Sequence, residues 1–181
     1  MFSALWTTLA FLLSGPPFHY SSLTIGLFGL AGAGGALMAS VAGRLVDRSL
    51  EKPLTVAMLV ASIIGFVFLL VGSEHLWSVL VGIVVLDVGT QGLHVTNQAI
   101  IYQRRPEARS RVTTIYMVTF FIGGTIGSSG ASVIYGYLGW NGVCGFGILV
   151  GVLALLLAAI PFFRAEPGHQ SPLPRDTQAL T

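Results

Sequence analysis

The chain has 181 residues, of which 54% are hydrophobic and only 9% are charged. Soluble domains carry about 25% charged residues, so this composition excludes an ordinary water-soluble fold. The net charge of +2 does not indicate a nucleic-acid partner, because the nine Lys and Arg residues are confined to short stretches between long apolar segments. The composition therefore predicts an all-α membrane protein surrounded by a lipid bilayer.

Apolar segments follow one another along the whole chain, and we expect each to be a transmembrane helix. Crossing the hydrocarbon core takes roughly 20 residues, and all the segments except the first reach or approach that length. The first begins at the initiator Met and is followed by Gly15, so we expect it to be truncated, either in the reading frame or as part of a longer protein. The six predicted spans are Phe2–Ser14, Leu23–Ala42, Leu54–Val71, Leu76–Tyr102, Val112–Leu138 and Val143–Phe163.

The basic residues predict the orientation of these spans. Lys and Arg are retained on the cytoplasmic side of membrane proteins, so the connections Arg44–Pro53 and Arg104–Arg111 are expected inside. The connections that lack basic residues, 16–22, 72–75 and 139–141, are expected outside. Residues 1–163 are thus predicted to form a six-helix transmembrane bundle, and residues 164–181 a disordered cytoplasmic tail. Both termini are expected in the cytoplasm.

Small residues repeat at intervals of one helical turn in two of the spans. Such stripes allow helix backbones to approach closely, because lipid provides no hydrophobic force that would drive the helices together. Static packing explains most of these positions, and bending or sliding of the helices is the functional alternative. The stripes are Gly35, Ala39 and Gly43 near the second span and Gly123, Gly127 and Ala131 in the fifth.

The fourth span carries a polar face in its cytoplasmic half. Asp87 lies near the middle of this span, where an ionised carboxylate facing lipid would cost about 2.5–3.5 kcal/mol. We therefore expect Asp87 to face protein or a water-filled cavity. The polar residues of the span are Asp87, Thr90, Gln91, His94, Asn97 and Gln98.

Two of these residues are candidates for proton binding. Intramembrane ionisable groups commonly mark ion or substrate paths, so Asp87 is the first candidate, and a structural Asp bonded to a neighbouring helix is the alternative. His94 titrates near neutral pH and is either a second member of a proton relay or an ordinary hydrogen-bonding residue. Gln91, Asn97 and Gln98 suit a substrate cavity or polar contacts between helices.

The fifth span opens with hydroxyl-bearing residues that are candidates for the same cavity. Hydroxyl groups can instead bond to carbonyls of their own helix, and both interpretations remain open. The residues are Thr113, Thr114, Tyr116 and Thr119.

A short string in the fifth span resembles a protease motif. The run Gly127-Ser128-Ser129-Gly130 matches the G-x-S-G string of rhomboid intramembrane proteases, in which Ser129 would be the nucleophile. A nucleophilic Ser needs a His base within hydrogen-bond reach, and the His that follows, His169, lies in the polar tail. We keep a protease as a remote alternative and predict no enzymatic activity. Since Cys144 has no companion ligands, no metal site or cofactor is predicted.

A loop motif resembles the major facilitator superfamily of transporters. The run Gly43-Arg44-Leu45-Val46-Asp47-Arg48 is similar to the cytoplasmic loop signature G-x-L-x-D-R-x-G-R-R/K of that family. Lys52 fits the signature, whereas Leu50 and Glu51 stand where Gly and a basic residue are expected. A longer spaced match resembles bacterial drug- and sugar-efflux members. It comprises Asp87-Val88-Gly89-Thr90-Gln91, Asn97-Gln98, Arg109-Ser110-Arg111, Tyr116-Met117 and Phe121-Ile122-Gly123-Gly124.

This resemblance implies half of a major facilitator fold, built from two inverted three-helix repeats, Phe2–Val71 and Leu76–Phe163. It implies proton-coupled efflux of small organic molecules across a bacterial inner membrane. Asp47 would pair with a basic residue at a cytoplasmic gate, for which Arg109 and Arg111 are candidates. The other six-helix half is the implied partner. The alternative is a fragment that does not transport alone, or a half-unit that needs another six-helix partner.

Overall fold

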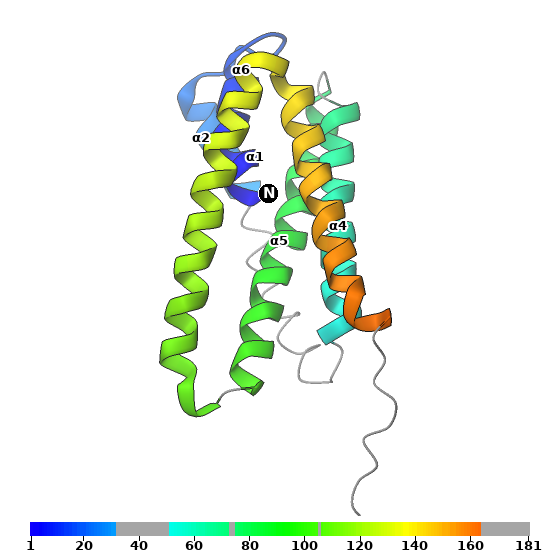
Figure 1. Ribbon diagram of the computed structural model, residues 1–181. Coiled ribbons are helices and arrows are strands. Elements are labelled where there is room, and N and C mark those ends of the chain that lie inside the picture. Colours follow the sequence, from blue (N-terminus) through cyan, green and yellow to red (C-terminus); the bar gives the residue numbers. More distant parts are fainter. Residues whose placement is uncertain (32–50, 73–74, 105, 164–181) are drawn as a thin grey trace, which may run out of the picture.

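The computed structural model describes residues 1–31, 51–72, 75–104 and 106–163 (Figure 1). Within these residues every regular element is a helix, which confirms the all-α prediction. The elements are α1 (Phe2–Ser14), α2 (Ser22–Ala31), α4 (Glu51–Val71), α5 (Leu76–Arg104), the short 3-10 helix η1 (Pro106–Ala108) and α6 (Arg109–Phe163). The loop residues Gly43, Asp47 and Arg48 and the predicted tail 164–181 lie outside the described residues.

Three of the described helices are long and apolar enough to cross a membrane. They contain the segments Glu51–Val71, Leu76–Tyr102 and Arg109–Ala159, and α1 is a shorter apolar helix. The last segment has 51 residues. One crossing takes roughly 20 residues, so α6 is long enough to cross twice.

A single residue breaks α6 and turns the chain back on itself. Gly139 has φ 63° and ψ −159°, and this positive φ is readily adopted only by glycine. Figure 1 shows the two resulting arms running in opposite directions from this turn, the first arm in yellow-green and the second in orange. The first arm, residues 109–138, and the second arm, residues 140–163, correspond to the fifth and sixth predicted spans. The predicted connection 139–141 was too long, because helical backbone resumes directly after Gly139.

At the charged end, two helices begin earlier than predicted. Helix α4 already begins at Glu51, and Pro53 is accommodated in its first turn, where a missing N–H is harmless. Arg109 and Arg111 belong to the first turn of α6 and not to a loop. The Arg109 guanidinium lies 5.9 Å from the centre of the Tyr102 ring on α5, which links the two helix ends.

The described basic residues gather at one end of the bundle. Figure 1 places the start of α4, the end of α5 and both ends of α6 at that end. The connections between α1 and α2, between α4 and α5, and around Gly139 lie at the opposite end. The separation of charged and uncharged connections predicted from the sequence is therefore present in the described part of the bundle.

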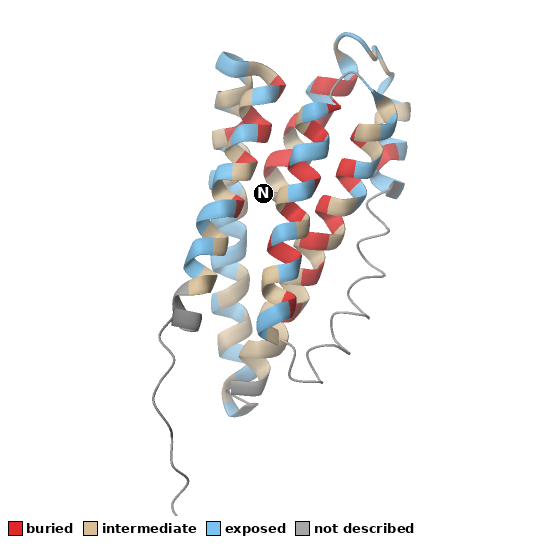
Figure 2. Ribbon diagram, turned by 90° about the vertical axis from the view of Figure 1, so that its right-hand side faces the viewer, coloured by how far each residue is buried: buried red, intermediate tan, exposed pale blue. Residues whose placement is uncertain are grey.

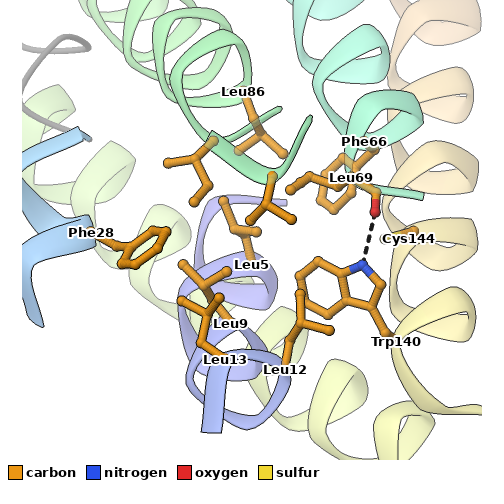
Figure 3. Close-up of a cluster of buried hydrophobic side chains, with 12 residues drawn as sticks. Leu5, Leu9, Leu12, Leu13, Phe28, Phe66, Leu69, Leu86, Trp140 and Cys144 are labelled. Atoms are coloured by element: carbon orange, nitrogen blue, oxygen red, sulfur yellow. Dashed lines mark hydrogen bonds between the residues drawn. The ribbon is translucent and has the colours of Figure 1, made fainter. Parts of the chain in front are cut away.

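The main hydrophobic core lies near the uncharged end. It joins leucines of α1 to apolar side chains of α4, α5 and the second arm of α6 (Figure 3). The indole N–H of Trp140 donates a hydrogen bond of 2.9 Å to the backbone oxygen of Leu69, which fixes the second arm against the end of α4. The outer surface is different: Figure 2 colours much of α6, the helix leading into the grey C-terminal trace, as exposed or half-buried. Ile115, Phe121 and Ile126 on this helix are all more than 60% exposed, as expected for contact with lipid or further helices.

Helices α4 and α5 approach each other most closely, through glycines that the sequence analysis did not single out. A Cβ atom added to Gly65 would lie 2.8 Å from the backbone nitrogen of Leu86, and Gly82 and Gly89 are similarly crowded by α4. The predicted stripe in the fifth span was wrong in part, because Gly123 and Gly127 have no neighbouring atom within 4 Å of such a Cβ. Periodicity reveals a stripe of small residues but does not reveal which helix faces it.

We predict that Gly65→Ala destabilises the bundle by about 1–3 kcal/mol, because the new methyl group would overlap the Leu86 backbone, which cannot rotate away. The matched control, Gly127→Ala, places the same methyl group in open space and should leave stability within about 0.5 kcal/mol or raise it slightly. Unfolding in mixed micelles, followed by circular dichroism, measures both. Equal stability of the two variants would contradict the close α4–α5 packing.

Candidate functional site

The candidate site lies on α5, about a quarter of a turn away from the face that packs against α4. Gly82, Leu86 and Gly89 form the α4-facing stripe. At 100° per residue, the stripe of Thr90, His94 and Asn97 is displaced from it by about 80° and faces a pocket. The predicted polar face extends further round the helix than this stripe, because it also includes Gln91 and Gln98.

Asp87 is hidden from the surroundings of the bundle. Its side chain is 1% exposed, and the indole N–H of Trp6 on α1 donates a hydrogen bond of 3.4 Å to its Oδ1. This bond is long, and within the described residues Trp6 is the one side chain that bonds to the carboxylate. The expectation that Asp87 faces protein and not lipid is confirmed.

His94 lies at the centre of a second hydrogen-bonded group. The Tyr116 hydroxyl on α6 lies 2.9 Å from Nδ1 of His94, and Nε2 of Gln98 lies 3.2 Å from Nε2 of His94. The Tyr116 hydroxyl also donates to the backbone oxygen of His94, at 3.4 Å. If the Gln98 amide donates, Nε2 of His94 is the acceptor and Nδ1 carries the proton, which it donates to Tyr116. The three bonds are then mutually consistent. The Phe120 ring packs against the His94 ring in a tilted arrangement, with 4.7 Å between the ring centres.

A pocket of about 380 Å³ opens beside this group, between α5, α6 and the beginning of α1. Five of the predicted cavity residues line it, namely Thr90, His94, Asn97, Tyr116 and Thr119. Gln91 and Gln98 are not among its lining residues, although Gln98 reaches it indirectly by bonding to His94. The remaining lining residues are Met1, Phe2, Ser3, Leu93, Phe120, Gly123, Gly124 and Val150.

The two candidate proton sites are not directly connected. Within the described residues no hydrogen bond joins Asp87 to His94. The hydroxyl of Thr90, between them along α5, donates to the backbone oxygens of Leu86 and Asp87, at 2.9 and 3.3 Å. A proton relay between Asp87 and His94 would therefore need water in the pocket to bridge them.

A wider pocket, of about 560 Å³, separates α1 from the first arm of α6. Aromatic rings and hydroxyl groups form its wall, and Thr7 and Ser128 are joined across it by a hydrogen bond of 2.8 Å. Sequence analysis missed this pocket and its tryptophan, Trp6. One signal was available: a tryptophan in a short apolar helix needs a partner for its N–H when it is buried. The lining residues are Phe2, Ser3, Trp6, Thr7, Phe121, Gly124, Thr125, Ser128 and Ser129.

The hydroxyls at the start of α6 act mainly within their own helix. Thr113, Thr114 and Thr119 each donate to the backbone oxygen four residues earlier, at 2.7 to 3.1 Å. These bonds fit the interpretation that the hydroxyls bond to carbonyls of their own helix. Thr119 also lines the smaller pocket. Two residues of this group also bond across to α5: the Tyr116 hydroxyl bonds to His94, and the Thr113 hydroxyl donates to the Tyr102 hydroxyl at 3.2 Å.

The partners predicted for the remaining sequence candidates lie outside the described residues. Arg109 and Arg111 are placed at the start of α6, whereas Gly43, Asp47 and Arg48 lie outside the described residues, so the predicted gate pairing stays a prediction. Ser129 lines the wider pocket, and His169, the base that a protease would need, also lies outside the described residues.

Comparison with known proteins settles the family. The family model described as Major Facilitator Superfamily matches residues 1–180. The chain belongs to the major facilitator superfamily. This membership points to a membrane transporter and not to an enzyme, and it confirms the resemblance seen in the loop motif and in the spaced residues of α5 and α6.

The named relatives are bacterial transporters longer than this chain. "Uncharacterized transporter YgaY" of Escherichia coli O157:H7 is 42% identical over 168 residues, which cover 93% of this chain and 43% of that protein. "Probable transporter SCO4007" of Streptomyces coelicolor is 34% identical over 144 residues, which cover 78% of this chain and 33% of that protein. The chain thus spans less than half the length of these relatives. No solved structure matches it.

We predict that Tyr116→Phe lowers the free energy of unfolding by about 1 kcal/mol, because it removes the hydroxyl that bonds to His94 and joins α6 to α5. The matched control is Tyr137→Phe, since the Tyr137 side chain is 86% exposed. Denaturant titration in mixed micelles measures both variants. An equal loss in the two would show that the His94–Tyr116 bond does not stabilise the pairing of α5 with α6.

Proposed function

We propose that this chain supplies half of a proton-coupled transporter that exports small organic molecules across a bacterial inner membrane. The observation that carries the proposal is the 1%-exposed carboxyl of Asp87 near the middle of α5, beside a polar pocket that contains His94. A charge at that depth is costly, so an acidic residue held there usually serves an ion or substrate path.

The coupling follows from the charge change at Asp87. In a surrounding of low dielectric constant, gaining or losing a proton changes the local electrostatic energy far more than in water. A proton can therefore bias the bundle between two arrangements, provided that its affinity differs between them. His94 would add a second proton site nearer the charged end.

The smaller pocket suits a small organic molecule. Its volume of about 380 Å³ lies in the range of ordinary ligand sites. Asn97, Thr90 and Tyr116 offer neutral hydrogen-bonding groups, and Phe120 offers an aromatic surface. Gln91 and Gln98 would contribute from the edge of the same face.

The architecture that we propose is six membrane helices in two inverted repeats, Phe2–Val71 and Leu76–Phe163, with Gly139 separating the fifth helix from the sixth. Asp47, in the loop with Gly43 and Arg48, would pair with Arg109 or Arg111 at a cytoplasmic gate. Both termini would lie in the cytoplasm.

A second candidate is a half-unit that transports only with another six-helix partner. Two observations favour it. The chain spans 43% of the Escherichia coli relative, and the glycines Gly26, Gly29, Gly123 and Gly127 face open space in which another helix could pack. The two candidates differ only in whether the partner belongs to the same polypeptide.

Cysteine labelling tests the proposed orientation. His19 and Glu107 are exposed and lie at opposite ends of the bundle. We predict that a membrane-impermeant maleimide added to intact cells labels His19→Cys and not Glu107→Cys, and that inverted vesicles give the reverse. The parent chain is the control, since its Cys144 is fully buried. Labelling of both positions from the same side would refute the orientation and, with it, the proposed transport direction.

A chimera tests the proposed function. In it, this chain replaces the matching segment of the Escherichia coli relative, in inverted vesicles whose pH gradient is reported by the quenching of an acridine dye. We predict that at least one compound from a panel of drugs, sugars and amino-acid derivatives relieves the quenching by exchanging with protons. We further predict that Asp87→Asn reduces this response about tenfold or more, because an amide cannot carry the proton.

The matched control for the chimera is Glu51→Gln, which neutralises a carboxyl at the start of α4, far from both pockets. It should transport like the parent. Full proton exchange by the Asp87→Asn chimera would disprove the assignment of Asp87, and transport by this chain alone would exclude the half-unit.

A further inference from the structure

Trp6 lies between Asp87, the residue on which the proposed function depends, and the wider pocket. Its ring forms part of the wall of the wider pocket, and its N–H bonds to Oδ1 of Asp87 on the neighbouring helix. The Phe2 ring, 6.2 Å away between centres and inclined by 56°, supports the indole from the preceding turn of α1. Phe2 lines both pockets, whereas Trp6 lines only the wider one.

The bond between Trp6 and Asp87 is sensitive to the state of the carboxyl group. An indole N–H can only donate, and an ionised carboxylate is a stronger acceptor than a neutral acid. Trp6 is therefore held most firmly when Asp87 is ionised. When Asp87 takes up a proton the bond weakens, and the ring in the pocket wall becomes freer to move.

The described elements packed around Asp87 place no other charged group against its carboxylate. Helix α4 presents Ser62 and Gly65 to this part of α5, and its charged residues, Glu51 and Lys52, lie at its start. Helices α1 and α2 contain no titratable side chain. The remaining titratable groups on this side of the bundle are the Met1 amino group, which precedes α1, His94 on α5 itself and Tyr116 on α6.

We propose that Trp6 is a positioning residue that links occupancy of the wider pocket to the protonation of Asp87. The link rests on the proposed function, since it assumes that Asp87 exchanges a proton. A molecule that packs against the indole ring changes how firmly its N–H is held. The coupling of two binding sites is reciprocal. If protonation of Asp87 changes the affinity of the pocket for an occupant, the occupant changes the affinity of Asp87 for its proton by the same factor.

Carbodiimide labelling measures this link without a known substrate. Dicyclohexylcarbodiimide enters membranes and modifies carboxyl groups in their neutral form, and mass spectrometry of the chain in lipid nanodiscs gives the labelling rate of Asp87. We expect Trp6→Phe to raise that rate at pH 7 by about three- to tenfold, as for the loss of one ordinary hydrogen bond, because the bond of 3.4 Å is long. The substitution keeps an aromatic ring and removes only the donor.

Two matched variants make the result specific. Trp77→Phe removes an 81%-exposed indole, and Trp140→Phe removes a buried indole that bonds to Leu69. Neither should change the labelling of Asp87. If Trp140→Phe has the same effect as Trp6→Phe, or if no variant has an effect, the inference is overturned while the proposed function stands. If Asp87 in the parent is not labelled at any pH from 5 to 9, both fail.

A covalently attached ring tests whether an occupant of the wider pocket affects Asp87. Thr125 is exposed and lines the wider pocket, so Thr125→Cys can carry a benzyl group from benzyl methanethiosulfonate, a reversible stand-in for an occupant. We expect the attached ring to change the labelling rate of Asp87 about twofold or more, dithiothreitol to reverse the change, and Trp6→Phe to abolish it. The parent, whose Cys144 is buried, controls for the reagent. An unchanged rate, or a change that persists in Trp6→Phe, overturns the link.

Discussion

The bundle is organised by the need to keep one carboxyl group away from lipid. Asp87 lies near the middle of the longest polar face in the chain, where an exposed charge would cost about 2.5–3.5 kcal/mol. Helix α4 covers one side of α5, and α1 covers the carboxylate itself with the indole of Trp6. The leucines of α1 that enter the core fix the position of that indole, because Leu5 and Leu9 are almost completely buried among α4, α5 and α6. The short first helix is therefore central to the site.

The two sides of α5 are packed very differently, and this difference creates the pockets. Against α4, glycines bring the backbones so close that no side chain could be inserted at Gly65 or Gly89. Toward α6, α5 makes far fewer contacts, and the His94–Tyr116 hydrogen bond is the main polar link. The result is a tight α4–α5 pair with an open polar flank.

Charge and hydropathy predicted the helices well because both act locally along the chain. The bounds of α1 and the start of α5 agree with the sequence, and the errors at Glu51, Arg109 and Gly139 affect only connections. The site was predicted less completely. Helical periodicity identified Asp87 and His94, but the partner of Asp87 lies 81 positions away, and no local pattern relates Trp6 to it. The open stripe at Gly123 and Gly127 failed for the same reason, since a stripe does not identify its neighbour.

The two proton candidates differ in what a change of charge would disturb. If His94 gains a proton, both ring nitrogens become donors, and rotation of the Gln98 amide can present an oxygen to Nε2. That adjustment stays within α5 and leaves the Tyr116 bond to Nδ1 in place. If Asp87 gains a proton, the bond that weakens is the one that joins α5 to α1. Protonation of His94 can therefore be absorbed by one side chain, whereas protonation of Asp87 alters the contact between two helices. Of the two, Asp87 is therefore the stronger candidate for the coupling site of the proposed transporter.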